Sequence, residues 1–131
     1  MTKLHHLAEQ AVKKALETGR TVAAAESLTA GMVSAVIADT AGSSGMLQGG
    51  VVAYQNSVKV DVLGVPEELL AAAGSVDGAV AAAMADGART ALRADIGIAT
   101  TGVAGPEEHD GKAVGTVFIG IATAAGASYL E

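Results

Sequence analysis

The stretch Ala23-Ala24-Ala25-Glu26-Ser27-Leu28-Thr29-Ala30-Gly31 decides the fold. The apolar run that begins at Thr21 predicts a buried strand, and it stops at the polar pair Glu26-Ser27. After Thr29, apolar residues recur at helical spacing, which predicts a helix. The stretch is therefore expected to place Ser27 in a turn between the carboxyl end of a strand and the amino end of a helix.

Two interpretations of this turn are open from the stretch alone. In an open α/β sheet, ligands bind at the carboxyl ends of the strands. Free amide groups at the start of a helix can also hold an anion or a developing oxyanion there. Alternatively, the hydroxyl of Ser27 or Thr29 only caps the helix, which is a common role for these residue types.

The composition limits the class of protein. A chain of 131 residues, half of them apolar, fits one domain with a real core. Ala and Val dominate and only three residues are aromatic, so close packing of helices on a sheet is expected, but not base stacking. The net charge of −6 also argues against a phosphate backbone as partner. We therefore expect no nucleic-acid partner.

Membrane, disulfide and metal chemistry have little support in the sequence. No apolar run reaches membrane-spanning length, and the first residues read as an amphipathic helix, so no membrane partner and a cytoplasmic location are expected. The absence of cysteine excludes disulfides and thiolate ligands. His5 and His6 point to different sides of a helix and lack a third ligand, so no metal and no cofactor are expected.

Periodicity and turn signals predict the remaining elements. The expected helices cover Leu4–Leu16, a turn at Asp61–Gly64, Glu67–Ala72, and a longer helix capped by Ser75 or Asp77. The expected strands cover Leu47–Tyr54, Ile96–Thr101 and Val114–Thr123, with a returning strand from Ala127. This order predicts an α/β fold: a mainly parallel mixed sheet with helices on both faces.

Polar side chains follow three of the expected strands. They are Ser27, the cluster Tyr54–Lys59, and Thr101 with its glycine loop. Because parallel strands end at the same edge of a sheet, these groups are expected to converge.

Ser27 needs a base to act as a nucleophile. No histidine follows a strand end, so Lys59 is the candidate, provided that its pKa falls from about 10.4 through desolvation or a neighbouring cation. Two alternatives are open. Ser57 is a weaker partner for Lys59, because residues two apart diverge on a helix. Asp61 or Glu26 can instead neutralise Lys59 as an ordinary ion pair.

Four blocks together resemble a known family. They are Ala25–Gly31, Gly49–Lys59, Thr101-Gly102-Val103-Ala104-Gly105-Pro106 and Val114-Gly115-Thr116-Val117. In this order and spacing they resemble the CinA C-terminal domain family, the nicotinamide-nucleotide amidohydrolases or nicotinamide mononucleotide deamidases. The match covers nearly the whole chain. It implies a three-layer α/β/α sandwich, in agreement with the pattern of elements.

The resemblance also implies an activity and a site. The family hydrolyses the carboxamide of nicotinamide mononucleotide to nicotinic acid mononucleotide and ammonia, without metal. Its Ser-Lys dyad carries over onto Ser27 as nucleophile and Lys59 as base. The residues expected to bind substrate by side chain or amide are Tyr54, Thr29, Gly31, Asn56, Thr101, Gly102 and Gly105. The amides of the Ser27 turn and of the glycine loop are expected to hold the oxyanion and the phosphate. Which set of amides holds which group is open at this point.

The chain departs from the family pattern at two places. The family often has Cys and Gly where this chain has Leu28 and Ala30, and neither change removes the hydroxyl or the lysine. Family members also continue with another strand and a final helix that bears a basic residue. Residues 1–131 are therefore expected to form a single domain of this type without those two elements.

Other classes of function stay open at this point. A domain of this family can retain the nucleotide pocket and act as a binding module in competence or the DNA-damage response. A structural subunit is a third interpretation. Small-residue surfaces and the open sheet edge favour a homo-oligomer, a dimer or higher.

Overall fold

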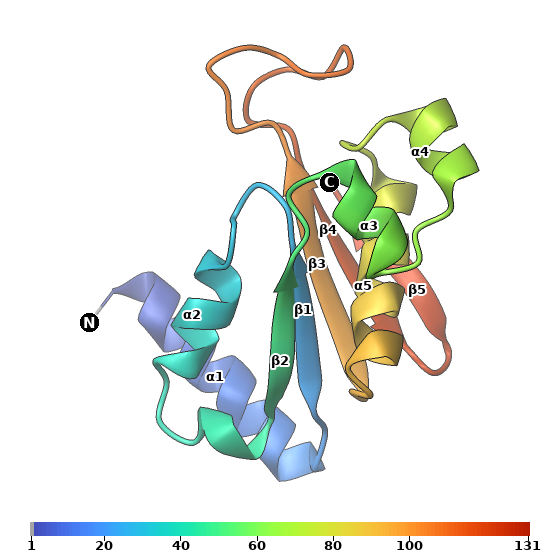
Figure 1. Ribbon diagram of the computed structural model, residues 1–131. Coiled ribbons are helices and arrows are strands. Elements are labelled where there is room, and N and C mark those ends of the chain that lie inside the picture. The colour runs from blue at the N-terminus through green and yellow to red at the C-terminus, as the bar shows by residue number, and fades with distance from the viewer. Residues whose placement is uncertain (1) are drawn as a thin grey trace.

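Residues 2–131 are described by the computed structural model, and within them five strands form one mixed sheet (Figure 1). The strands lie in the order β2-β1-β3-β4-β5. Their bounds are β1 (Val22–Glu26), β2 (Leu47–Val52), β3 (Ile96–Gly102), β4 (Val117–Thr123) and β5 (Gly126–Leu130). The pairs β1–β2 and β1–β3 are parallel, whereas β3–β4 and β4–β5 are antiparallel. The predicted α/β class with a mixed sheet is confirmed.

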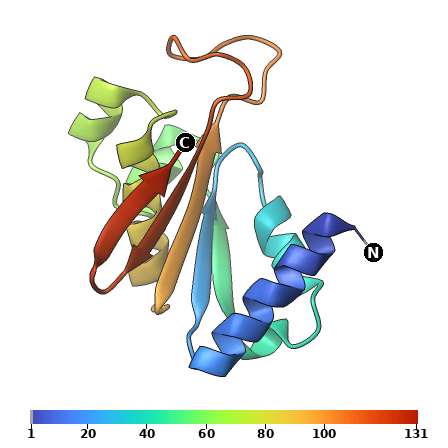
Figure 2. The ribbon, with the colours of Figure 1, turned by 180° about the vertical axis from the view of Figure 1, so that it is seen from behind.

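Helices cover both faces of this sheet, which gives three layers (Figures 1 and 2). On one face, Val12 of α1 (Lys3–Thr18) and Ile37 of α2 (Met32–Ala38) share a core cluster with Val22. The other face carries α3 (Asn56–Asp61), α4 (Glu67–Ala73) and α5 (Gly78–Ala91). A short 3-10 helix, η1 (Ser43–Gly45), leads into β2.

One predicted helical element begins earlier in the chain than expected. The helical turn expected at Asp61–Gly64 is the end of a longer helical segment, because α3 already covers Asn56–Asp61 and Gly64 N still donates to Val60 O at 3.0 Å. Gln55 is the N-cap residue of α3 and has an extended backbone, so the helix begins at Asn56, only a few residues after β2 ends. The shift puts Lys59 inside α3, where its side chain is buried.

Small residues let α5 approach the sheet closely. Ala23 and Ala25 of β1 and Ala99 of β3 are buried against the helix. Gly97 and Gly120 go further: a Cβ atom at either position would overlap a backbone carbonyl oxygen of α5, that of Ala85 or of Ala81. The many alanine and glycine residues thus allow α5 to pack at a short distance from the sheet.

The opposite face of β4 and β5 carries exposed apolar side chains. Ile119 is 49% exposed, Ile121 47% and Leu130 70%. In the antiparallel ladder Ile119 lies directly opposite Leu130, so these side chains form one apolar surface. No helix among residues 2–131 is both long and apolar enough to cross a membrane.

The turn between β1 and α2 has an unusual backbone. Ala30 lies in the left-handed region with φ 48°, and Gly31 follows with φ 104°. The left-handed conformation is costly for a residue with a Cβ atom and free for glycine. Ala30 therefore holds a strained conformation in this turn.

The first prediction concerns the helix–sheet contact. Gly120→Ala should lower the free energy of unfolding by about 1–3 kcal/mol, because the added methyl group meets backbone that cannot yield. Gly49→Ala is the matched control, since its Cβ would meet only the movable Cδ1 of Leu92, at 3.3 Å. Urea denaturation measures both. An equal loss in the two variants would contradict the explanation.

The second prediction concerns the turn. Ala30→Gly should raise the free energy of unfolding by roughly 0.5–1 kcal/mol, because glycine removes the left-handed strain. Ala35→Gly, in the exposed face of α2, should instead lower it by roughly 0.5–1 kcal/mol. Thermal and urea unfolding of the two variants check the opposite signs. Destabilisation by both changes would show that Ala30 is unstrained.

Candidate active site

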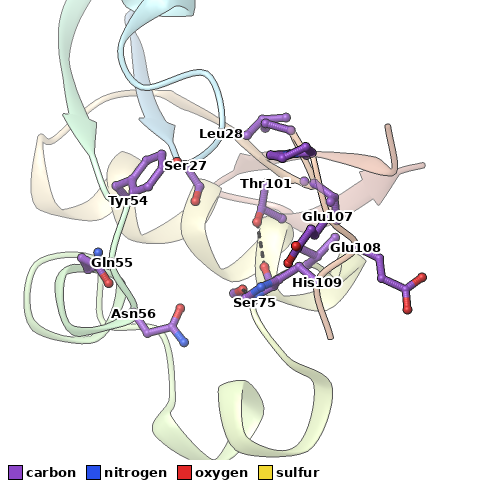
Figure 3. A pocket seen from close by; sticks show the side chains of 16 residues that line it. Ser27, Leu28, Tyr54, Gln55, Asn56, Ser75, Thr101, Glu107, Glu108 and His109 are labelled. Carbon is purple, nitrogen blue, oxygen red and sulfur yellow. Dashed lines mark hydrogen bonds between the residues drawn. The ribbon is translucent and has the colours of Figure 1, made fainter. Parts of the chain in front are cut away.

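The three polar strand ends meet at one edge of the sheet, around a cavity of about 730 Å³ (Figure 3). Ser27 follows β1, Tyr54 and Asn56 follow β2, and Thr101 is the last residue but one of β3. Gly102 and Gly105 line the same cavity. Its size lies in the range of pockets that take small molecules.

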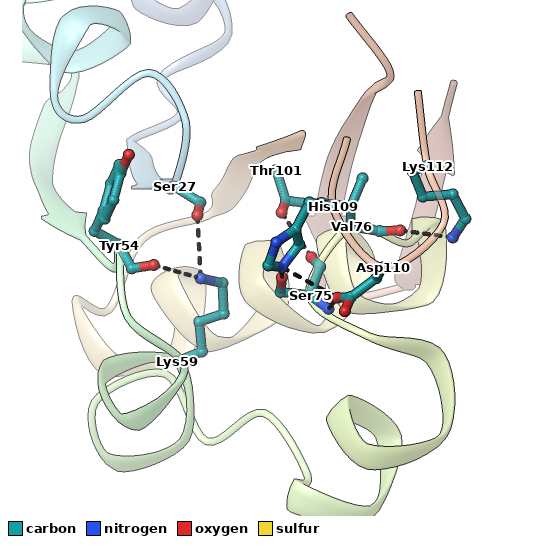
Figure 4. A network of polar contacts seen from close by, with 9 residues as sticks. All are labelled: Ser27, Tyr54, Lys59, Ser75, Val76, Thr101, His109, Asp110 and Lys112. Atoms are coloured by element: carbon teal, nitrogen blue, oxygen red, sulfur yellow. Dashed lines mark hydrogen bonds and ion pairs between the residues drawn. The ribbon is translucent and has the colours of Figure 1, made fainter. Parts of the chain in front are cut away.

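Lys59 reaches this edge from α3. Its side chain is 1% exposed, and its Nζ lies 3.1 Å from Ser27 Oγ (Figure 4). The carbonyl oxygens of Ala53 and Tyr54 accept from the same nitrogen at 2.8 Å and 3.1 Å. The amine is therefore enclosed by three oxygen atoms.

The alternative partners of Lys59 are not found. Its polar contacts are Ser27 and the two carbonyls, and Ser57 is not among them. Within the part of the chain that the structure describes, no carboxylate lies within 4.0 Å of Nζ, so the ion pair with Asp61 or Glu26 is not formed. The structure brings Lys59 to Ser27 instead.

The surroundings of Lys59 favour the neutral amine. Burial lowers its pKa, because the charged form loses hydration that the protein does not replace with a carboxylate. A neutral amine has two N–H donors and one lone pair. When Ala53 and Tyr54 accept the two N–H groups, the lone pair faces Ser27 Oγ. That geometry suits removal of the serine proton.

Free amide groups flank the serine. Across the described residues, the N–H groups of Leu28 and Thr29 donate to no other protein group, and the same holds for Ala104 and Gly105. Leu28, Ala104 and Gly105 line the cavity, so their amides are available to a ligand. Such donors stabilise negative charge that develops on a carbonyl oxygen.

Thr29 and Gly31 lie behind the cavity and do not line it. The hydroxyl of Thr29 contacts Glu26 Oε1 at 2.6 Å and Thr100 Oγ1 at 2.7 Å. Gly31 is the N-cap residue of α2 and supplies no side-chain bond. The expected capping by Ser27 or Thr29 is wrong.

Glu26 caps α2 instead. Its carboxylate accepts the N–H groups of Val33 and Ser34, at 2.8 Å and 2.9 Å. Sequence reasoning missed this role because the capping rules look for a short polar residue next to the helix. Glu26 reaches the helix from the last position of a strand, across the whole turn.

The far wall of the cavity is built from two loops (Figure 4). Ser75 is central: its carbonyl accepts from Thr101 Oγ1 at 2.7 Å, and its hydroxyl lies 3.1 Å from His109 Nε2. Asp110 and Lys112 hold the same segment, through the amide of Ser75 and the carbonyl of Val76. The sequence carries no local signal for this wall, since Ser75 and His109 are 34 positions apart. The residues described hold no group of three or more His, Cys, Asp or Glu side chains that could take a metal ion.

The similarity to curated relatives extends over most of this chain. A protein from Bacillus pumilus named as competence-damage inducible is 49% identical over 117 residues, which cover 89% of this chain and 28% of that protein. A CinA-like protein from Frankia casuarinae is 48% identical over 107 residues, 82% of this chain and 25% of that one. The chain therefore spans less than a third of the length of these relatives.

Solved structures agree in fold. The competence/damage inducible protein CihA from Agrobacterium tumefaciens matches with a TM-score of 0.94 and 34% identity, over 100% of this chain and 81% of that chain. A CinA superfamily protein from Escherichia coli matches with a TM-score of 0.93 and 26% identity, over 98% and 75%. The CinA C-terminal domain family matches residues 4–131. The chain belongs to the CinA C-terminal domain family.

Proposed function

We propose that this domain is an amidohydrolase that converts nicotinamide mononucleotide to nicotinic acid mononucleotide and ammonia, with Ser27 and Lys59 as its catalytic dyad. The four sequence blocks support the substrate. The observation that carries the chemistry is the buried amine of Lys59, 3.1 Å from Ser27 Oγ and held by two carbonyls. A buried lysine with a lowered pKa beside a serine is a known form of nucleophile activation.

The first half of the reaction forms an acyl-enzyme. Neutral Lys59 takes the proton of Ser27 as Oγ attacks the carboxamide carbon, and the carbonyl oxygen becomes an oxyanion. The free N–H group of Leu28, a residue that lines the cavity next to the nucleophile, receives that charge. The ammonium of Lys59 then gives its proton to the leaving nitrogen, and ammonia departs.

The second half restores the enzyme. Lys59, neutral again, takes a proton from water as the water oxygen attacks the acyl carbon. Collapse of this second oxyanion breaks the bond to Ser27 Oγ, which recovers its proton from Lys59. The product is the carboxylic acid. Over the whole cycle the leaving nitrogen gains one proton and water supplies it, while Ser27 and Lys59 return to their starting protonation states.

The lining of the cavity is compatible with the rest of the substrate. The ring of Tyr54 is 60% exposed at the cavity and can lie against the pyridinium ring, which is both aromatic and cationic. Asn56, Ser75 and His109 offer hydrogen-bonding groups to a sugar or a phosphate. The amides of Ala104 and Gly105 are a second set of donors for an anionic group.

A second candidate is a nucleotide-binding module without turnover. The relatives that are named as competence-damage inducible favour it. Calorimetry with nicotinamide mononucleotide separates the two: tight binding with no ammonia release supports the module. The expected cytoplasmic location and homo-oligomeric assembly stay predictions.

The third prediction concerns the dyad. Ser27→Ala should reduce ammonia release from nicotinamide mononucleotide to background, because no nucleophile remains. Lys59→Met keeps the length of the side chain and should slow release by about 10²–10⁴-fold, the usual contribution of a general base. Lys13→Met, on the exposed surface of α1, is the control. Wild-type rates in both dyad variants would rule out this mechanism.

The fourth prediction concerns pH. The active form is neutral Lys59, whose pKa burial lowers from 10.5, so kcat/KM should rise with pH as the ammonium loses its proton. The rise should be complete below the ordinary pKa of a lysine. Initial rates between about pH 6 and 9 measure it, with thermal unfolding at each pH as the control for stability. A flat profile over that range contradicts a role for Lys59 as base.

A further inference from the structure

Glu26 is a buried carboxylate that the proposed mechanism does not use. Glu26 is 1% exposed. Among the described residues, no cationic group lies within 4.0 Å of its carboxylate. Four donors surround it instead. Oε1 accepts from Thr29 Oγ1 at 2.6 Å and Val33 N at 2.8 Å, and Oε2 accepts from Ser34 N at 2.9 Å and Ser34 Oγ at 2.6 Å.

These donors keep the group ionised. Burial by itself would raise the pKa of Glu26, but the hydrogen bonds from Ser34, Thr29 and the two amides outweigh it and lower the pKa. An ionised carboxylate only accepts hydrogen bonds. The Thr29 hydroxyl therefore donates its one proton to Glu26, and the hydroxyl of Thr100 must donate to Thr29, 2.7 Å away.

This network encloses the turn that carries Ser27. Glu26 is the last residue of β1 and directly precedes Ser27. Its carboxylate accepts hydrogen bonds from the first turn of α2, on the other side of the turn. Thr29 ties the middle of the turn to the same carboxylate and to β3. The backbone of Ser27 is held as well, since its N–H donates to Thr100 O at 3.0 Å and its carbonyl accepts from Ala30 N at 3.1 Å.

We infer that Glu26 is a positioning residue, which fixes Ser27 Oγ opposite Lys59 and holds the free amide of Leu28 at the cavity. This inference rests on the role proposed for Ser27. An ordinary N-cap residue would satisfy the helix alone. Glu26 joins the end of a strand to the start of a helix across the nucleophile turn, so its loss removes the side-chain link between the two ends of that turn.

The test uses Glu26→Gln. This variant keeps the shape of the side chain but replaces one acceptor oxygen with an NH₂ group, which cannot accept a hydrogen bond from the surrounding donors. The rate at which a fluorophosphonate probe labels Ser27 should fall about 100-fold, the usual cost of a nucleophile misplaced by an ångström. With nicotinamide mononucleotide, kcat should fall similarly while KM stays within about twofold, because the pocket lining is untouched. Amide hydrogen exchange of Ala30 should accelerate, whereas exchange in α5 should not.

Two controls separate positioning from loss of stability. Glu9→Gln makes the same chemical change on the exposed surface of α1 and should have no effect. Val12→Ala removes buried atoms far from the site and lowers stability without touching the turn. If Glu26→Gln fails to fold, Thr29→Ala cuts one of the four bonds and should slow labelling by about 10-fold.

The outcomes are distinguishable. Labelling of Ser27 in the wild type without ammonia release would end the proposed activity, while the effect of Glu26→Gln on labelling would still decide the inference. Wild-type labelling in Glu26→Gln, or a loss that Val12→Ala reproduces, would overturn the positioning role. Unchanged exchange at Ala30 would also overturn it, and that measurement does not depend on whether the probe or the substrate reacts.

Discussion

A buried amine needs acceptors, and Lys59 finds them where β1 and β2 end. The carbonyls of Ala53 and Tyr54 and the hydroxyl of Ser27 surround its nitrogen. The parallel pairing of β1 with β2 brings these atoms to one edge, and α3 begins early enough to send the lysine inward. Without these acceptors α3 would bury an unpaired polar group, which costs free energy.

The two faces of the β1 segment keep the carboxylate of Glu26 away from the amine of Lys59. Successive residues of a strand point to opposite faces, so Glu26 turns toward α2 while Ser27 turns toward α3. Each buried group is held by neutral dipoles and not by a counter-ion. A carboxylate beside Lys59 would raise the pKa of its amine and remove the lone pair at neutral pH. The alternation of side chains along the strand therefore favours the neutral amine that the proposed chemistry needs.

The sequence predicts the scaffold better than the details of the site. Apolar runs locate the strands, Asp77 caps α5 as expected, and parallel strand ends bring Ser27, Tyr54 and Thr101 together. Capping by Glu26 and the Ser75–His109 wall are not predictable in the same way. Hydrophobic periodicity reports which face of an element is buried, but these contacts join elements whose relative placement follows only from the packed fold.

The apolar surface of Ile119, Ile121 and Leu130 has a consequence for how the molecule responds to temperature. Whatever covers that surface gains about 25 cal/mol for each Å² of apolar area removed from water. Near room temperature this gain is almost entirely entropic. Contacts made through β4 and β5 therefore tighten on warming and loosen in the cold, opposite to the polar contacts that close the far wall of the cavity.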